Sequence, residues 1–204
     1  MKKAILLLNV GTPLSPQVAD VKRYLTEFLL DPRVITKQAL LRQLLVRGII
    51  VPFRKRKSAK LYQAIWTEKG SPLLTHTIDL KNSLQELLRS EYIVEAAMRY
   101  QEPTIDQALH RLQKERLSHL IVVPLFPQYA SATTGSSIEA VMQKMARWDH
   151  FPQKIVFLNQ FWNDQHFIDA FVESAKKWPI QNYDKILFSF HGLPQEQDRA
   201  SATH

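Results

Sequence analysis

The chain has 204 residues, no cysteine, and 27 basic against 19 acidic side chains, which gives a formal net charge of +8. Without cysteine there is no disulfide framework, no thiolate zinc site and no iron–sulfur cluster held by this chain. An apolar content of 45% is typical of a globular protein, and no apolar run approaches the ~20 residues of a membrane-spanning helix, so we expect a cytoplasmic protein.

Apolar runs and helical patterns alternate along the chain. Continuous apolar runs of this kind are typical of parallel strands that helices cover on both faces, and the spacing of Leu80, Ile105 and Phe167 with later apolar residues predicts helices between them. The sequence therefore predicts an α/β, Rossmann-like doubly wound parallel sheet. The expected strands are 3–10, 92–98, 119–126, 154–158 and 185–190.

A boundary near residues 148–152 divides this pattern into two parts. Residues 1–150 hold enough strands and helices for one complete lobe. Residues 151–204 are too few for a second doubly wound domain, so we expect only part of a second lobe there. That part would carry the strand that ends at His191.

The excess positive charge lies in one segment. Between Pro32 and Thr67 there are nine basic residues and no acidic one. Within it, residues 37–57 place an apolar stretch directly before the basic block Arg54–Lys57. This pattern is typical of a helix lying on an anionic bilayer, and a buried helix beside a basic loop is the alternative. The first interpretation predicts peripheral contact at the inner membrane face. No nucleic-acid partner is expected, because the basic segment has few aromatic residues and no zinc-finger or RNP pattern occurs.

We expect the catalytic and binding residues directly after the predicted strands, because ligands of open α/β sheets bind beyond the carboxyl ends of the strands. The five glycines form neither a dinucleotide fingerprint nor a Walker loop, and no nucleophile elbow occurs. His191 ends the last predicted strand, where a neutral imidazole could ligate a metal or accept a proton, or serve only as a structural histidine. The hydroxyl-rich residues 133–137 precede a predicted helix and suit an anion or a simple N-cap.

Six motifs follow one another along nearly the whole chain. They are Asn9–Pro13, Tyr24–Asp31, Trp66–Leu73, Met98–Tyr100, Leu125–Ser137 and Ser189–Pro194. Together, in this order, they resemble the ferrochelatase family. That resemblance implies two Rossmann-like lobes with a porphyrin between them, and a lyase-class metal chelatase that inserts ferrous iron into protoporphyrin IX in haem biosynthesis. Iron and protoporphyrin would be substrates, and no tightly bound cofactor is expected. The tyrosine of the coproporphyrin branch would fall at Val10, which favours protoporphyrin.

The same resemblance implies roles for individual residues. His191 matches the family's catalytic histidine, which is proposed to ligate the metal and to accept a pyrrole proton. The residues that match positions lining the porphyrin site are Arg54, Tyr62, Ser71 and Arg99, with Ser137 and Arg33 as weaker matches.

The family's chains continue beyond the last residue of this one, and the continuation carries a glutamate that faces the histidine. No residue here matches that glutamate, so we expect an incomplete second lobe. A non-catalytic porphyrin- or anion-binding relative at the membrane surface is the alternative function. A carboxylate opposite His191 would distinguish the two.

Overall fold

Four parallel strands form the sheet in the computed structural model, which describes residues 2–193 of the chain. The first strand lies inside the sheet, because the order is β2-β1-β3-β4. All three pairings are parallel. The prediction of an α/β fold with a parallel sheet is therefore confirmed. The strands are β1 (Lys2–Gly11), β2 (Tyr92–Tyr100), β3 (Leu117–Pro124) and β4 (Lys154–Phe157).

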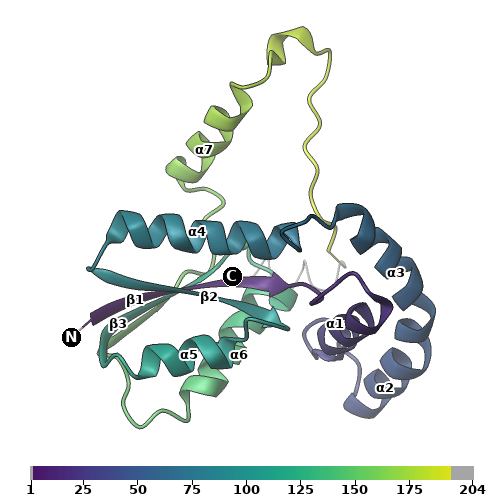
Figure 1. The fold of residues 1–204 in the computed structure, drawn as a ribbon, viewed down its shortest axis with the longest axis horizontal. Helices are drawn as coiled ribbons and strands as arrows, with labels where there is room; N and C mark the ends of the chain where they lie inside the picture. The colour runs from purple at the N-terminus through teal and green to yellow at the C-terminus, as the bar shows by residue number, and fades with distance from the viewer. Residues whose placement is uncertain (1, 194–204) are drawn as a thin grey trace.

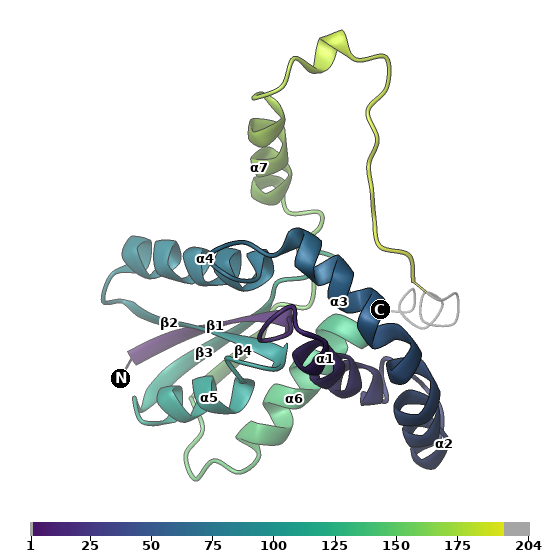
Figure 2. The ribbon, with the colours of Figure 1, turned by 45° about the vertical axis from the view of Figure 1, so that its right-hand side comes forward.

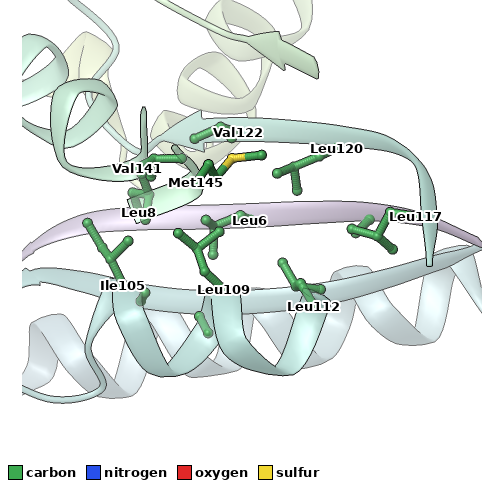
Figure 3. Packing of buried hydrophobic residues seen from close by; sticks show 13 residues of the cluster. Leu6, Leu8, Ile105, Leu109, Leu112, Leu117, Leu120, Val122, Val141 and Met145 are labelled. Atoms are coloured by element: carbon green, nitrogen blue, oxygen red, sulfur yellow. The ribbon is translucent and has the colours of Figure 1, made fainter. Parts of the chain in front are cut away.

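Helices cover both faces of this sheet (Figure 1). Side chains of β1 alternate between the faces, as the period of a strand requires. Leu6 and Leu8 pack with buried side chains of one layer of helices (Figure 3), whereas Leu7 belongs to a separate cluster on the opposite face. The first layer holds α5 (Ile105–Gln113) and α6 (Ser136–Met145), and the opposite one holds α4 (Pro72–Leu88).

Local signals in the sequence fix where these helices begin. Thr104 and Gln107 form a reciprocal cap at the start of α5. The Thr104 hydroxyl accepts from the Gln107 amide at 3.2 Å, and the Gln107 side chain accepts from the Thr104 amide at 3.1 Å. α4 begins with Pro72, a residue suited to the first helical turn because it needs no amide partner there. Both helices begin near the carboxyl edge of the sheet. α5 follows the end of β2, and Ser71, just before α4, bonds Thr12, just after β1.

A separate helical layer lies beyond the carboxyl ends of β1 and β2 (Figures 1 and 2). A shared core that includes Val21, Val46, Val51 and Ala59 joins its helices, and Tyr100 at the end of β2 belongs to the same core. The layer therefore packs against the edge of the sheet where ligands are expected. Its elements are α1 (Val18–Leu30), α2 (Ala39–Leu44), a π-helical turn (Leu45–Ile50) and α3 (Val51–Ile65).

The last part of the described chain differs from the prediction. Residues 185–190 form no strand, and Leu187 and Phe188 are 91% and 82% exposed. A strand needs a neighbour for its amide and carbonyl groups, and the described residues supply none for this segment. The apolar run indicated a tendency to form a strand, but it gave no information about whether a neighbouring strand is there to pair with it.

The residues after the expected lobe boundary near 151 begin with β4. β4, which we assigned to the second lobe, pairs with β3 and extends the first sheet to Phe157. After β4, α7 (Gln165–Ala175) projects away from the sheet in both views (Figures 1 and 2). A short 3₁₀ turn (Ile180–Asn182) and an extended segment with His191 follow. Where one lobe ends and another begins stays a prediction.

Candidate functional site at the carboxyl edge of the sheet

The carboxyl ends of β1 and β2 approach each other closely at Gly11. This residue has φ +104°, and a Cβ atom placed on it would lie 2.0 Å from the carbonyl oxygen of Tyr100. Only glycine fits both the backbone conformation and the space. The chain can therefore turn at the end of β1 and carry Thr12 to the start of α4.

Thr12 and Ser71 form a buried pair of hydroxyls at this turn. The Thr12 hydroxyl donates to the Ser71 oxygen at 2.9 Å, and both residues are almost fully buried. Beside them lies a surface hollow of about 410 Å³. Its lining includes the apolar side chains of Pro13, Leu14 and Trp66. A hydroxyl pair at the base of an apolar hollow suits a ligand with a flat apolar body and a polar group.

A row of aromatic rings leads from the hollow into the helical layer. Trp66 meets Tyr62 edge-on with centroids 6.4 Å apart, and Tyr62 meets Tyr24 at 6.1 Å. Tyr24 stacks on Phe28, which meets Tyr100 at 5.3 Å. Burial raises the pKa of the half-buried Tyr62, so its phenol stays protonated at neutral pH. Because Trp66 lines the hollow and Tyr62 contacts Trp66, one ring separates Tyr62 from the hollow.

Asp31 is the centre of a buried polar cluster at the inner end of that row. One carboxylate oxygen accepts from the guanidinium of Arg99 at 2.7 Å, the phenol of Tyr100 at 2.8 Å and the hydroxyl of Ser136 at 2.5 Å. The other oxygen accepts from the amide of Arg33 at 2.7 Å. The cluster ties the end of α1 to the end of β2 and the start of α6.

The pKa values in this cluster follow from burial and hydrogen bonding. Burial of the Asp31 carboxyl alone would raise its pKa, but the bonds from Ser136, the Arg33 amide and Tyr100, with the charge of Arg99, outweigh it and lower the pKa. Burial raises the pKa of Tyr100, and the negative charge of Asp31 adds to that effect. Asp31 is thus ionised and Tyr100 neutral at physiological pH.

Two of the three arginines predicted for the substrate site, Arg99 and Arg33, contact this cluster. Arg99 also donates through Nε to the Ser136 hydroxyl at 2.7 Å, so two of its donor nitrogens are engaged within the protein. Arg33 donates to Ser131 at 2.9 Å and forms an ion pair with Glu139. Both guanidinium groups therefore hold α6 and the turn before it in place.

The other predicted residues lie in different surroundings. Ser71 and Tyr62 lie at or next to the hollow, whereas Arg54 is exposed on α3. Ser137 is fully buried, and its hydroxyl has no hydrogen-bond partner in the structure, so it cannot touch a substrate in this conformation. His191 is exposed in the extended segment. Among residues 2–193, no three acidic or histidine side chains gather closely enough to hold a metal ion.

The hydroxyl-rich residues 133–137 do not cap α6. Helical backbone already begins at Ser131 in a π-helical turn, and no side chain caps either element. Ser136 uses its hydroxyl for Asp31, and the hydroxyl of Thr134 is buried without a partner in the structure. Simple N-capping is therefore the wrong interpretation, and the serine that bonds Asp31 is Ser136, one position before the predicted Ser137.

Within residues 37–57 the chain is helical from Ala39 onward, and most of the apolar side chains face solvent. Leu40 and Phe53 are 74% and 81% exposed, whereas Val46 and Val51 are buried against α1. The basic block Arg54–Lys57 lies within α3. The alternative of a buried helix beside a basic loop is therefore wrong. In the part of the chain that the structure describes, no helix has the length and apolar character needed to cross a bilayer.

Asp31, Thr12, Tyr100 and Ser136 were not among the predicted site residues. All four lie within the motifs that carried the resemblance, at or near the ends of predicted elements. The sequence signal that could have identified them was a polar side chain next to an apolar helix or strand. Their mutual contacts join residues up to 105 positions apart, which no local pattern shows.

Comparison with known proteins shows which family the chain belongs to. The family model described as ferrochelatase matches residues 2–203. A ferrochelatase of Legionella pneumophila (strain Philadelphia 1) is 43% identical over 195 residues, which are 96% of this chain and 58% of that protein. A ferrochelatase of Coxiella burnetii (strain RSA 493) is 41% identical over 198 residues, 95% of this chain and 54% of that protein. The chain thus spans a little over half the length of these relatives, and it belongs to the ferrochelatase family.

Proposed function

We propose that this chain forms the porphyrin-binding lobe of a ferrochelatase, which inserts ferrous iron into protoporphyrin IX to form protohaem. The observation that carries the proposal is the apolar hollow beside the Thr12–Ser71 hydroxyl pair. A porphyrin has a flat apolar ring and two carboxylates. Trp66 and its apolar neighbours suit the ring, and the hydroxyl of Ser71 suits a carboxylate oxygen.

Metal insertion requires a group that accepts the protons leaving the porphyrin and ligates the incoming metal ion. Insertion of one ferrous ion releases the two pyrrole protons of the ring, so the net charge of the porphyrin core is unchanged. We assign His191 to this role, because a neutral imidazole can both ligate iron and accept a proton near pH 7. Iron is a substrate here, and the proposal includes no resident cofactor.

The remaining predicted residues divide into two groups in this proposal. Tyr62, Ser71 and the exposed Arg54 would contact the porphyrin or its carboxylates. Arg99 and Arg33 would act through the loops that they fix, because their donors already bond within the protein. Ser137 has no direct contact in the proposal, because it is buried.

Replacing His191 with alanine should abolish metal insertion while leaving porphyrin binding measurable. The test is the absorption spectrum of protoporphyrin mixed anaerobically with the chain and ferrous iron. His150→Ala is the matched control, because His150 is also exposed but follows α6 away from the hollow. Metallation by the wild type and the control alone would support the proposal. Binding without metallation by any variant would favour a non-catalytic porphyrin-binding protein, and unchanged spectra would contradict both.

We also propose that residues 37–57 rest on an anionic membrane surface at the inner face. Exposed apolar side chains on α2 and α3 lie next to the basic block Arg54–Lys57, so the same surface can enter the headgroup region and pair with anionic lipids. A porphyrin that partitions into membranes could reach the lobe there. The cytoplasmic location stays a prediction.

Phe53→Ser should weaken binding to vesicles of phosphatidylglycerol and phosphatidylcholine about tenfold, because burial of one phenyl ring in an apolar phase stabilises by roughly 1.5–3 kcal/mol. Vesicle co-sedimentation measures this change. Phe151→Ser is the control. Phe151 is also exposed, but it lines a different hollow, beside Trp148 after α6. Equal losses for the two variants would contradict the proposed surface.

A further inference from the structure

The turn between α3 and α4 holds Lys69 in the wall of the hollow. The amide of Thr67 donates to the carbonyl of Gly70 at 3.1 Å, and the amide of Gly70 donates back at 3.0 Å. The Thr67 hydroxyl adds a bond to the same Gly70 carbonyl at 2.9 Å. Gly70 has φ +98°, a conformation that favours glycine. Lys69 therefore projects from a turn that three hydrogen bonds fix.

Two ionisable side chains line this hollow, and they carry opposite charges. They are Lys69 and Glu102, which follows β2. Neither forms an ion pair or a side-chain hydrogen bond with another residue of the described part of the chain, and both are exposed. The ammonium of Lys69 is thus available to an anionic group of a ligand, whereas Glu102 would repel one.

Ser71 presents a second donor two residues from Lys69. Its oxygen accepts the proton of Thr12, and no described acceptor takes the proton of Ser71 itself. An ammonium and a free hydroxyl proton in the lining of one hollow match a carboxylate, which accepts hydrogen bonds at both oxygens. The apolar lining then meets the remainder of the ligand.

We infer that Lys69 is a specificity-determining residue that pairs with one propionate of the porphyrin beside Ser71, while Glu102 keeps the propionate to the Lys69 side of the hollow. This inference rests on the proposed function and deepens it. The hollow then selects carboxylated porphyrins over their neutral esters, and the ring lies against Trp66. The selection comes from the charge at Lys69, because the apolar lining contacts acid and ester alike.

The test compares protoporphyrin with its dimethyl ester in absorbance titrations of the full chain. Lys69→Gln should weaken binding of the diacid about twofold to fivefold, the range for loss of an ion pair that solvent reaches. Glu102→Gln should strengthen it about twofold, because a repulsive charge is removed. Both variants should bind the diester as the wild type does. Lys114→Gln is the control, because it removes the same charge from a different hollow, which Leu112 and Trp148 also line.

The outcomes separate this inference from the proposed function. If the wild type binds neither porphyrin, the proposed function fails. If the wild type binds the diacid but Lys69→Gln binds it equally well, only the role of Lys69 is overturned. Equal losses for diacid and diester would also overturn it, because a charge pair cannot act on the ester.

Discussion

Replacing Asp31 with alanine should lower the free energy of unfolding by about 3–5 kcal/mol, the range for breaking a buried ion pair by removal of one partner. The side chain of Asp31 is 3% exposed and that of its partner Arg99 is 24% exposed. The variant would leave the guanidinium without its counter-charge. It would also leave the phenol of Tyr100 and the hydroxyl of Ser136 without their acceptor. Urea denaturation followed by circular dichroism measures the change.

The matched control is Asp79→Ala, which removes an exposed carboxylate on α4 that has no ion pair with another described residue. A surface substitution of this kind should change stability by no more than about 0.5 kcal/mol. Similar effects of the two variants would contradict the role of the Asp31 cluster. Asp31→Ala should also weaken porphyrin binding indirectly, because the cluster fixes the end of β2, and Glu102 and Pro103, which follow β2, line the hollow.

Asp31→Asn should show how the charge of Asp31 contributes as pH changes. The folded protein holds the pKa of Asp31 below its ordinary value of 3.8. The ionised carboxylate therefore stabilises the folded state above 3.8, and this contribution disappears as pH falls through the lowered folded value. We expect the stability difference between wild type and Asp31→Asn to be constant at neutral pH and to narrow below 3.8. A difference that stayed unchanged in acid would mean that the charge contributes nothing.

The sequence allowed the first sheet to be predicted because its signal is local. β1, β2 and β3 are nearly continuous apolar runs, and helices cover both of their faces, so each run identifies itself without knowledge of its neighbours. Residues 154–158 gave the same signal, but the pattern could not show that the strand joins β3. Residues 185–190 are equally apolar, and they form no strand among the described residues because no partner is present.

The candidate site could be predicted only in part, and for a related reason. Resemblance assigned Arg99, Ser71 and Tyr62 to a porphyrin site, and that role stays a prediction. The structure places Ser71 in the lining of the hollow and Tyr62 one ring from it. The resemblance could not show that Arg99 faces a buried carboxylate 68 residues earlier. Between Ser136 and Ser137, a shift of one residue on a helix turns the side chain by about 100°. Only the packed structure decides which hydroxyl meets Asp31.

Hydrogen exchange should show a large difference between the first sheet and the segment that ends at His191. The amides of β3 lie between two paired strands, so they should exchange only when much of the lobe opens. Global unfolding of a domain costs about 5–15 kcal/mol. Protection in β3 should therefore exceed that of residues 185–190 by about a thousandfold or more. Mass-spectrometric exchange on a chain shown to be monomeric by size-exclusion chromatography measures this difference.

The reason lies in what covers the two segments. Leu120 and Val122 of β3 are fully buried, whereas Ile186 and Phe188 are mostly exposed and their backbone pairs with nothing among residues 2–193. β1, which is also central, is the internal control and should exchange as slowly as β3. Equal protection of residues 185–190 and β3 in the monomer would contradict the structure of this segment. Protection that arises only in an oligomer would instead show that another chain covers Ile186 and Phe188 and orders the strand before His191.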